Sequence, residues 1–516
     1  MNDIVGFLGT HQEIRELLLV MGTKSSAALV YDVCSMVKLD RLVLAVPDTE
    51  LKKEVQKAVQ RLRYETADYV PVHLEWIARE DAGKVCPKTG QMALLLDAPN
   101  TTEEVLAFLD KKPAYLIGTI DKTKINAFRI WEMYRKTASH IYLVSWEENH
   151  ASEALDWSKD PDSDLELSII FPVYRVAAYL EQCIRSVTAW KADYVEYLFV
   201  DDGSPDESAK IIKRYAKKDQ RIRLLQKKNG GCASARQYGL ERAKGRYVGF
   251  VDPDDYVDPS MFRKLLARAL TGSYEITYCG YRELYESTHT TKEVEDCLDI
   301  PYKNGTCDRN EIDRLIAYLR VAIWRGIYLR DMLTKNNIHF YTDLRRFDDL
   351  PFKVETFAAA KSVAAVPEYL YYYRMSRPGQ DVSADDECLF VHFSIFKHLD
   401  RSMAAAKEKV QLDYLQTVKI HTHRYALEKI RPELIGEYCA RARKDLLSNF
   451  PYAEGLYILK QFASWKDQVY FRAICKKNIQ LVKVLAGYQS GGSRMRRKQR
   501  QLRKFQKLDQ KYGKHS

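Results

Sequence analysis

The sequence predicts an α/β protein whose central sheet is mostly parallel. Between residues 167 and 260, apolar strand-like runs alternate with helical patterns, an order typical of a parallel sheet. Two of these runs, at 197–200 and 247–251, are continuously apolar, as expected for strands that are buried on both faces. Each of the two runs ends directly in a group of carboxylates.

Each element of this stretch has its own pattern. Apolar residues recur every three to four positions in the expected helices and form unbroken runs in the expected strands. Gly245 is expected to close the helix that precedes the last strand. The predicted elements are strand SIIFPVY (168–174, ending at Pro172), helix YLEQCIRSVTAW (179–190), strand YLFV (197–200), helix ESAKIIKRYAKKD (207–219), strand RIRLLQKK (221–228), helix ASARQYGLERAKG (233–245), strand YVGFV (247–251) and helix PSMFRKLL (259–266).

Two acidic clusters follow buried strands, VDDGSPDES at 200–208 and VDPDDYVDP at 251–259. Ligands of α/β sheets bind beyond the carboxyl ends of the strands, so these acids are expected to share one crevice. Carboxylates this close repel each other unless a positive charge lies between them, and a divalent cation that also binds a diphosphate would supply it. The acids are Asp201, Asp202, Asp252, Asp254 and Asp255.

From about residue 167 to 380, the chain resembles glycosyltransferase family 2. The resemblance rests on several motifs in the family's order: PVY, VDDGS, GGCASARQYGL, DPDD, FDDLPF and EYLYYYRMSRPGQDVS. It implies a GT-A fold, a single α/β domain that binds a nucleotide-sugar and a divalent metal, Mn²⁺ or Mg²⁺. It also implies an inverting transfer of a hexosyl or N-acetylhexosaminyl group.

The resemblance also implies roles in donor binding. Pro172 and Tyr174 match the opening loop that stacks on the base. Asp202 matches the acid that contacts the base edge, and Arg236 is expected near the diphosphate. Asp252 is expected toward the ribose and the metal.

Further matches concern the metal and the chemistry. Asp254 matches the second metal ligand of the DxD region. Asp349 matches the catalytic base of the family's Glu-Asp motif, although the first acid here is Asp348 instead of Glu. Arg374 and Arg377 fall in the segment that closes over the diphosphate.

The chemistry follows from where charge develops. Cleavage of the sugar from its diphosphate leaves negative charge on the departing oxygens, which a metal and Arg236 would stabilise. The acceptor hydroxyl needs a base, and Asp349 is the candidate. A single displacement with the base opposite the leaving group inverts the anomeric centre.

Several of these acids also have purely structural interpretations. Asp201 and Asp206 are typical of a turn or a helix cap in a DGSPDES string. Asp255 and Asp258 are typical of a cap for the helix at PSMFRKLL. Without the family, Asp348 and Asp349 read as a solvated pair, and Tyr174 as a packing aromatic.

Length and composition indicate the number of domains and the cellular compartment. A chain of 516 residues is expected to hold two to four domains. The ten cysteines show no C-x-x-C or zinc spacing, which predicts reduced thiols in a cytosol, with no disulfides and no structural zinc. No secretion signal and no membrane-spanning stretch are predicted.

Residues 1–160 are predicted to form a separate small α/β domain, joined through a linker at 157–166 (WSKDPDSDLE). The strand and helix patterns alternate, but GFLGTHQE lacks the G-x-G-x-x-G spacing of a dinucleotide site. Its role stays open between docking an acceptor, a partner or a second subunit, and bracing the enzyme domain. The expected strands are DRLVLAVPD, ADYVPVHLEWI, QMALLLDA, AYLIGTI and HIYLVSWE, and the expected helices are ELKKEVQKAVQRLRY, TTEEVLAFLDKK and KINAFRIWEMYRK.

After the enzyme domain at 167–384, residues 385–490 are predicted to form a helical extension. Helical spacing covers 387–410, 414–431 and 455–465. The histidines of this region are interpreted as structural or surface residues, since two of them stand two positions apart on different helix faces. They are His392, His398, His421 and His423.

The basic tail at 491–516 holds ten Lys or Arg side chains and one Asp, so it accounts for nine of the eleven formal positive charges. Its apolar residues fall in one arc of a helical wheel. A basic amphipathic helix binds anionic lipid, so the tail is interpreted as a reversible membrane anchor. A solvated tail and nucleic-acid binding are the alternatives, but nothing else in the chain resembles a nucleic-acid module.

The sequence therefore predicts a cytoplasmic, metal-dependent glycosyltransferase, peripheral at the inner face of the cell membrane. It would move a sugar from a nucleotide donor, with UDP as carrier, to a cell-surface glycan, teichoic acid or lipid-linked saccharide. A nucleotidyltransferase would need a Gly-rich basic loop after the first strand, which PVYRVAAYL does not supply. A catalytically silent scaffold protein is the other alternative. Donor sugar, acceptor, linkage and a homo-oligomeric state are left open.

Overall fold

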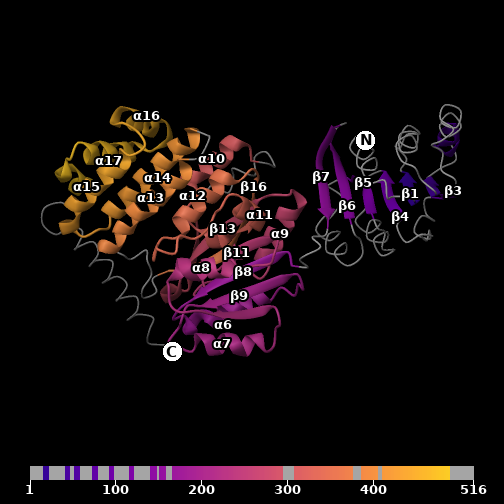
Figure 1. Cartoon of the computed structure of the whole chain (residues 1–516), viewed down its shortest axis with the longest axis horizontal. Helices are drawn as coiled ribbons and strands as arrows, with labels where there is room; N and C mark the ends of the chain where they lie inside the picture. Colours follow the sequence, from indigo (N-terminus) through magenta and orange to yellow (C-terminus); the bar gives the residue numbers. More distant parts are fainter. Residues whose placement is uncertain are drawn as a thin grey trace. The chain divides into compact units, whose positions relative to one another are not determined.

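The protein is described by a computed structural model (Figure 1). The structure describes residues 16–21, 41–46, 51–57, 73–78, 92–97, 115–120, 140–147, 150–158, 165–294, 307–375, 385–404 and 409–487. The chain divides into two compact units. The first holds residues 1–162 with 270–273, and the second holds residues 163–269 with 274–516.

The first unit contains a seven-stranded sheet in the order β3-β2-β1-β4-β5-β6-β7. All neighbouring strands are parallel except β6 and β7, which are antiparallel. Leu17–Leu19 of β1 and Leu42–Leu44 of β2 are buried. The strands are β1 Glu16–Met21, β2 Arg41–Val46, β3 His73–Ala78, β4 Met92–Asp97, β5 Tyr115–Ile120, β6 His140–Glu147 and β7 His150–Ser158.

Five of these strands, β2 to β6, lie where the sequence predicts them. Strands β1 and β7 were not predicted, and β7 includes Trp157 and Ser158, which were assigned to the linker. The start of the helix predicted at 50–64 is present at 51–57. The helices predicted at 101–112 and 124–136 lie outside the described residues.

The second unit is built on a nine-stranded sheet (Figure 1). Its strand order is β10-β9-β8-β11-β15-β13-β16-β12, with β14 beside β13. Strands β10, β9, β8 and β11 are parallel, and the remainder of the sheet is mixed. The strands are β8 Leu167–Val173, β9 Val195–Asp201, β10 Ile222–Gln226, β11 Tyr247–Phe250, β12 Tyr256–Val257, β13 Ile276–Tyr285, β14 Thr290–Glu293, β15 Gly326–Leu329 and β16 Val363–Arg374.

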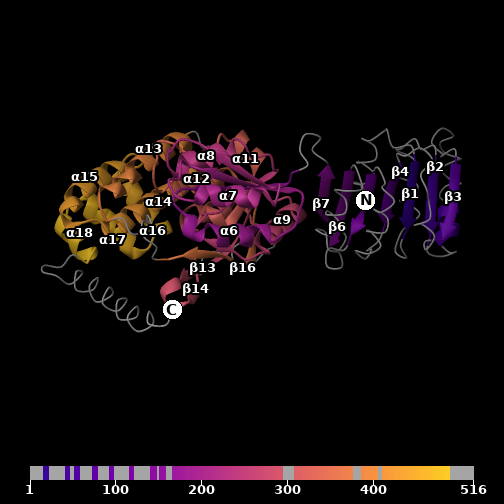
Figure 2. The same ribbon diagram turned by 90° about the horizontal axis from the view of Figure 1, so that it is seen from below.

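The α/β class is thus confirmed. The four parallel strands are the ones that the sequence predicts, and they place both acidic clusters at the same edge of the sheet because β8 lies between β9 and β11. The mixed half was not predicted. Figure 2 shows β13 and β16 side by side at the lower edge of this unit, with β14 next to β13.

Helices flank the sheet. They are α6 Ala177–Thr188, α7 Ser208–Ala216, α8 Cys232–Leu240, α9 Met261–Thr271, α10 Arg309–Tyr318, α11 Arg330–Lys335 and α12 Asp349–Ala359.

Helix α8 ends at Leu240, so the prediction that it continues to Gly245 was wrong. The backbone N–H groups of Lys244 and Gly245 instead donate to Ser168 Oγ at 3.1 and 2.8 Å. Gly245 lies so close to β8 that an added Cβ would stand 2.5 Å from the Ser168 nitrogen. The glycine is therefore required by close backbone approach and does not cap the helix.

The C-terminal region is a helical bundle that packs against α10 and α12 (Figure 1). One continuous apolar core joins it to the sheet, since Ile395, Phe396 and Leu415 of the bundle cluster with Phe250 and Phe352. No helix in the described part of the chain is long and apolar enough to cross a membrane. The helices are α13 Val391–Met403, α14 Lys409–Leu427, α15 Ile435–Leu446, α16 Tyr452–Phe462, α17 Trp465–Cys475 and α18 Ile479–Leu485.

The bundle histidines have structural partners. His392 and His423 are buried, and each makes a 3.1 Å hydrogen bond with the Tyr438 hydroxyl. His398 pairs with Asp343, and His421 with Asp467. The basic tail at 491–516 lies outside the described residues.

Candidate active site

The acidic turn after β11 is buried and tightly connected. The Asp255 N–H donates to the Asp252 carbonyl at 3.0 Å, which closes the turn. The Tyr371 hydroxyl accepts from the Asp252 N–H at 3.2 Å and donates to Asp255 Oδ2 at 2.9 Å. Asp254 and Asp255 are 4% and 1% exposed, whereas the Asp252 side chain is 24% exposed. Asp252 is therefore the acid of this turn that is most open to a ligand.

Arg236 connects this turn to the start of α12. Its Nη2 donates to Asp252 Oδ1 at 2.6 Å, and its Nη1 donates to Asp348 Oδ2 at 2.8 Å. The guanidinium is buried over the Phe340 ring, 5.9 Å from its centroid. Its Nε is buried and has no hydrogen-bond partner among the described residues. The protein therefore leaves this N–H group buried without an acceptor.

Asp349 differs from its neighbour Asp348. Asp348 is 4% exposed and bonded to Arg236, whereas the Asp349 carboxyl accepts no hydrogen bond from another residue in the described part of the chain. Burial, and then the nearby charge of Asp348, raise the pKa of Asp349 to about 7. A carboxyl with this pKa can both take and release a proton near neutral pH.

Asp202 lies in the turn after β9. Its carboxylate accepts from the N–H groups of Gly230 and Gly231, at 3.0 and 2.7 Å, and from Lys227 Nζ at 2.6 Å. Gly231 has a φ of +92° and stands directly before α8, the helix that holds Arg236. A backbone with this φ favours glycine. Asp202 therefore fixes the loop that positions Arg236.

Arg374 lies behind the acidic turn. It is 2% exposed, and its Nε donates to the Asp254 carbonyl at 2.7 Å. Its Nη2 donates to Gln182 at 2.9 Å, and it also pairs with Glu286. In this arrangement, Arg374 holds the turn in place. Its contact with a diphosphate stays a prediction.

Two further predicted residues, Pro172 and Tyr174, lie at the carboxyl end of β8. Pro172 is part of β8, and Tyr174 follows that strand with 41% of its surface exposed. Arg175, with a φ of +55°, stacks over the Tyr174 ring at 5.2 Å. Arg377 lies outside the described residues.

The carboxylates of the turn raise the pKa values of neighbouring acidic groups. Burial, followed by Asp254 and Asp252, raises the pKa of Asp255 well above its ordinary value. Burial and then the same three acids also raise the pKa of the Cys183 thiol. Negative potential therefore converges here, which favours a bound cation.

Some acids near the site have local structural roles in turns or near helix starts, which the sequence also allowed. Asp201 accepts from the Ser204 N–H at 2.9 Å and shapes the turn. Asp206 accepts from the N–H groups of Ala177 and Ser208. Asp258 accepts from the Ser260 N–H at 2.9 Å, near the start of α9. Asp255 is no helix cap, because Tyr371 and the Arg374 N–H occupy its carboxylate.

Sequence reasoning did not place three residues of the site. Asp348 was noted only as a departure from the family, and Lys227 and Tyr371 were not singled out. Lys227 follows directly on β10, so the strand-end argument could have found it. Tyr371 sits in a tyrosine-rich strand, and only burial distinguishes it from its neighbours.

The donor set at the turn suits a hard cation. Within the described ranges, no group of three or more His, Cys, Asp or Glu side chains is arranged to hold a metal ion. The turn offers two carboxylates, Asp252, whose side chain is 24% exposed, and Asp254, which is buried. Mg²⁺ commonly binds through one or two carboxylates together with substrate phosphates. The residues present thus fit such an ion in the company of a phosphorylated ligand.

Part of this chain is similar to known proteins. Residues 168–359 match the model of the family described as "Glycosyl transferase family 2". The uncharacterized glycosyltransferase EpsJ of Bacillus subtilis is 36% identical over 212 residues, 40% of this chain and 60% of EpsJ. The uncharacterized glycosyltransferase YibD of Escherichia coli is 30% identical over 224 residues, 41% of this chain and 62% of YibD. The chain thus spans about three fifths of the length of these curated relatives.

Among solved structures, S. aureus TarS 1–349 in complex with UDP-GlcNAc has a TM-score of 0.51 and 18% identity. The superposed region covers 63% of this chain and 91% of TarS 1–349. This likeness confirms a GT-A fold. The second unit therefore contains a glycosyltransferase family 2 domain, over residues 168–359.

Proposed function

We propose that the chain is an inverting, metal-dependent glycosyltransferase that moves a hexosyl or N-acetylhexosaminyl group from a nucleotide-diphosphate donor to an acceptor hydroxyl. The observation that supports this most is the bridge by which Arg236 joins Asp252 to Asp348. It links the acids that follow β11 to the acids that begin α12, so a donor and a base would meet at one edge of the sheet.

Asp349 is the proposed base. It adjoins the bridge, its carboxyl is not bonded to another described residue, and its pKa of about 7 suits proton transfer at neutral pH. It would take the proton of the acceptor hydroxyl as that oxygen attacks the anomeric carbon. Because one base acts on the face opposite the leaving group, the configuration would invert.

Donor binding would use the other residues of the edge. Pro172 and Tyr174 would flank the base, and Asp202 would contact its edge, while Arg236 would lie near the diphosphate, beside Asp252. Asp252 and Asp254 would hold Mn²⁺ or Mg²⁺. When bound, such an ion stabilises the negative charge of a departing diphosphate.

The substrates are proposed by analogy. UDP-sugars are the first donors to test, since the TarS structure contains UDP-GlcNAc. A cell-surface glycan, teichoic acid or lipid-linked saccharide is the proposed acceptor class. One matching protein is the poly(ribitol-phosphate) beta-glucosyltransferase of Bacillus spizizenii, 26% identical over 42% of this chain and 34% of that protein. We also propose a cytoplasmic location at the membrane surface, through the basic tail.

A panel of nucleotide-sugars tests the proposal. The full chain is mixed with each donor, with Mn²⁺ or with EDTA, and thermal stabilisation and donor hydrolysis are measured. A donor that stabilises and is hydrolysed only with metal supports the function. If no nucleotide or nucleotide-sugar binds in either condition, the result favours the alternative of a catalytically silent scaffold protein.

A further inference from the structure

A cavity of about 380 Å³ lies on the helical bundle, between α13 and α15. Its lining includes none of the residues predicted for the active site. Four of the lining side chains are cations and two are acids. The lining residues are Phe393, Lys397, Asp400 and Arg401 from α13, and Arg441, Lys444 and Asp445 from α15.

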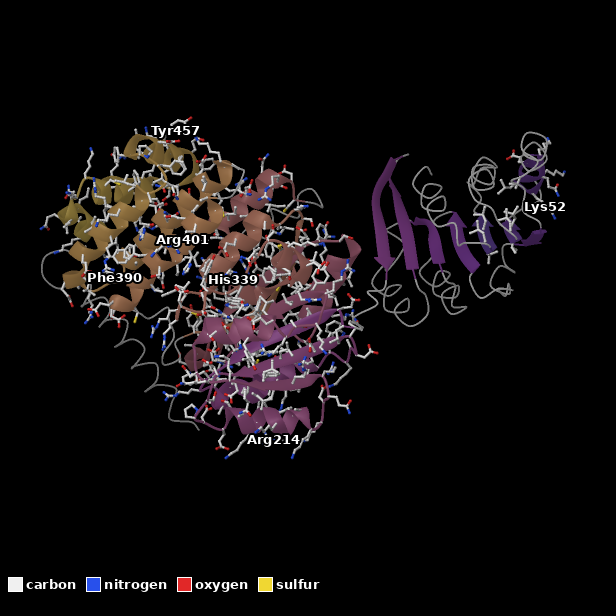
Figure 3. All side chains as sticks on the ribbon, viewed as in Figure 1. Lys52, Arg214, His339, Phe390, Arg401 and Tyr457 are labelled. Carbon is white, nitrogen blue, oxygen red and sulfur yellow. The ribbon has the colours of Figure 1, made fainter. Side chains whose placement is uncertain are left out.

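Helical spacing explains why these residues face one another. On α13, Phe393, Lys397 and Arg401 stand four positions apart and share one face. On α15, Arg441 and Lys444 are three positions apart and do the same. The Arg441 guanidinium lies 4.9 Å from the ring centroid of Phe390 and 6.0 Å from that of Phe393, so it joins the two walls. Figure 3 labels Phe390 and Arg401, near opposite ends of α13.

The two acids of the lining are bonded to groups in the bundle interior. Lys419 of α14 is fully buried, and its Nζ lies 2.8 Å from Asp400 Oδ2 and 3.1 Å from Asp445 Oδ1. The other Asp400 oxygen accepts from Asn449 at 2.8 Å, and the other Asp445 oxygen is 2.7 Å from His423 Nε2. Lys419 balances one of these two carboxylate charges, so the four cations of the lining remain in excess.

The cations, in contrast, are exposed and largely unpaired. Lys397, Arg401 and Lys444 make no hydrogen bond or ion pair with any described residue. Arg441 pairs with Glu437 at 2.8 Å, but both side chains are more than half exposed, so this pair contributes little. Four positive charges from two helices therefore converge on one hollow and outnumber its two carboxylates, one of which Lys419 balances from within.

We propose that this cavity binds the phosphate groups of a phosphodiester-linked acceptor chain. Arg and Lys are the side chains that bind phosphate, and guanidinium groups bind it through two parallel hydrogen bonds. Cations on both walls suit a ligand whose charges recur along its length. The apolar Phe393 ring suits the carbon backbone between two phosphates.

The position of α13 connects this cavity to the active site. His392, next to Phe393, packs on Phe347 with ring centroids 5.0 Å apart, and Phe347 directly precedes Asp348. His398, next to Lys397, bonds with Asp343 at 2.9 Å. A chain held at the cavity would thus be held by the same helix that supports the catalytic loop. The role as acceptor site rests on the proposed function, but the binding itself does not.

Binding to the full chain is tested without any donor, so failure of transfer would not affect the result. The probe is a soluble glycerol phosphate hexamer, measured by calorimetry and by hydrogen exchange of peptides covering α13 and α15. We expect saturable binding with protection of both helices. Protection elsewhere only, as from binding to the basic tail, would overturn the proposal.

The matched variants are Lys397→Gln/Lys444→Gln in the cavity and Lys213→Gln/Lys217→Gln at the end of α7, where Lys217 directly follows the helix. Both remove two exposed cations whose side chains have no described partner. The cavity variant should bind the hexamer about tenfold more weakly and lose the protection, because two phosphate contacts are removed. The α7 variant should bind like the wild type, and equal weakening in both would overturn the proposal.

A second binding experiment uses phosphatidylglycerol vesicles in place of the hexamer. They present the same phosphate chemistry in a lipid headgroup. Vesicles should leave α13 and α15 unprotected, which supports a soluble chain as the ligand. Protection of these helices by vesicles alone would overturn the assignment.

Discussion

Arg236 and Asp348 are 112 positions apart in the sequence, and a hydrogen bond of 2.8 Å joins their side chains. The same guanidinium binds Asp252 at 2.6 Å. Arg236 and Asp348 are both nearly inaccessible to solvent. A buried charge is tolerated when it is paired and hydrogen-bonded, so the three side chains form one interdependent unit.

The first prediction concerns this unit. Arg236→Gln leaves the Asp348 carboxylate buried without its cation, and we expect the free energy of unfolding to fall by about 3–5 kcal/mol. Urea denaturation measures the loss. Arg185→Gln, which removes an exposed Arg paired with Glu181, should leave the free energy of unfolding almost unchanged. If both variants lose the same free energy of unfolding, the bridge does not contribute specifically to stability.

The second prediction concerns the proposed base. Asp349→Asn keeps the size of the side chain but removes its ability to take a proton. Transfer should fall by about 10²–10⁴-fold while the donor affinity is retained. Asp331→Asn, an exposed acid on α11, should leave both unchanged. Transfer that survives in Asp349→Asn would exclude this residue as the base.

The third prediction concerns pH. A base acts only when it is unprotonated, and burial together with Asp348 raises the pKa of Asp349 to about 7. The value of kcat/KM should therefore rise about tenfold per pH unit below pH 7 and level off above it.

Asp348→Asn provides a check on the cause of this pH dependence. It removes the negative charge that helps to raise the pKa of Asp349, and it frees Arg236, whose charge lowers that pKa. Both effects move the rising limb of the pH profile toward acid. A limb that stays in place would show that Asp348 does not influence the titrating group.

The sequence could predict the acidic edge because strand direction alone determines it. Asp252 and Asp254 follow a continuous apolar run, and such runs in parallel sheets end at a common edge. The partner of each acid depends on tertiary packing. That Arg236 bonds Asp348, or that Tyr371 satisfies Asp255, depends on strands and helices that are distant in sequence.

The missed elements have weak local patterns. Strand β1 follows a charged stretch that resembles the start of a helix, and β7, HASEALDWS, has no apolar run. Helix α8 ends early although ERAKG favours a helix. The reason is that Ser168 and Glu196 of neighbouring strands bind the backbone at Lys244. Tertiary contacts override local propensity at this point.

The last prediction uses two glycines in different surroundings. In Gly245→Ala, the new Cβ would stand 2.5 Å from the Ser168 nitrogen and 2.6 Å from the Leu167 carbonyl carbon. Backbone atoms of β8 cannot yield as a side-chain end can, so β8 or the turn must shift, at a cost of about 1–3 kcal/mol.

Gly436, in α15, is the matched control, since a Cβ added there meets nothing within 4 Å. Gly436 is the second residue of α15, so Gly436→Ala should gain at most about 0.5–1 kcal/mol, the value for a helix interior, because alanine loses less conformational entropy than glycine in a helix. The urea midpoint of each variant against the wild type is the measurement. The same change from glycine to alanine should lower the free energy of unfolding at position 245 and raise it at position 436. A Gly245→Ala variant as stable as the wild type would mean that β8 and the turn at Lys244 are not packed as closely as described.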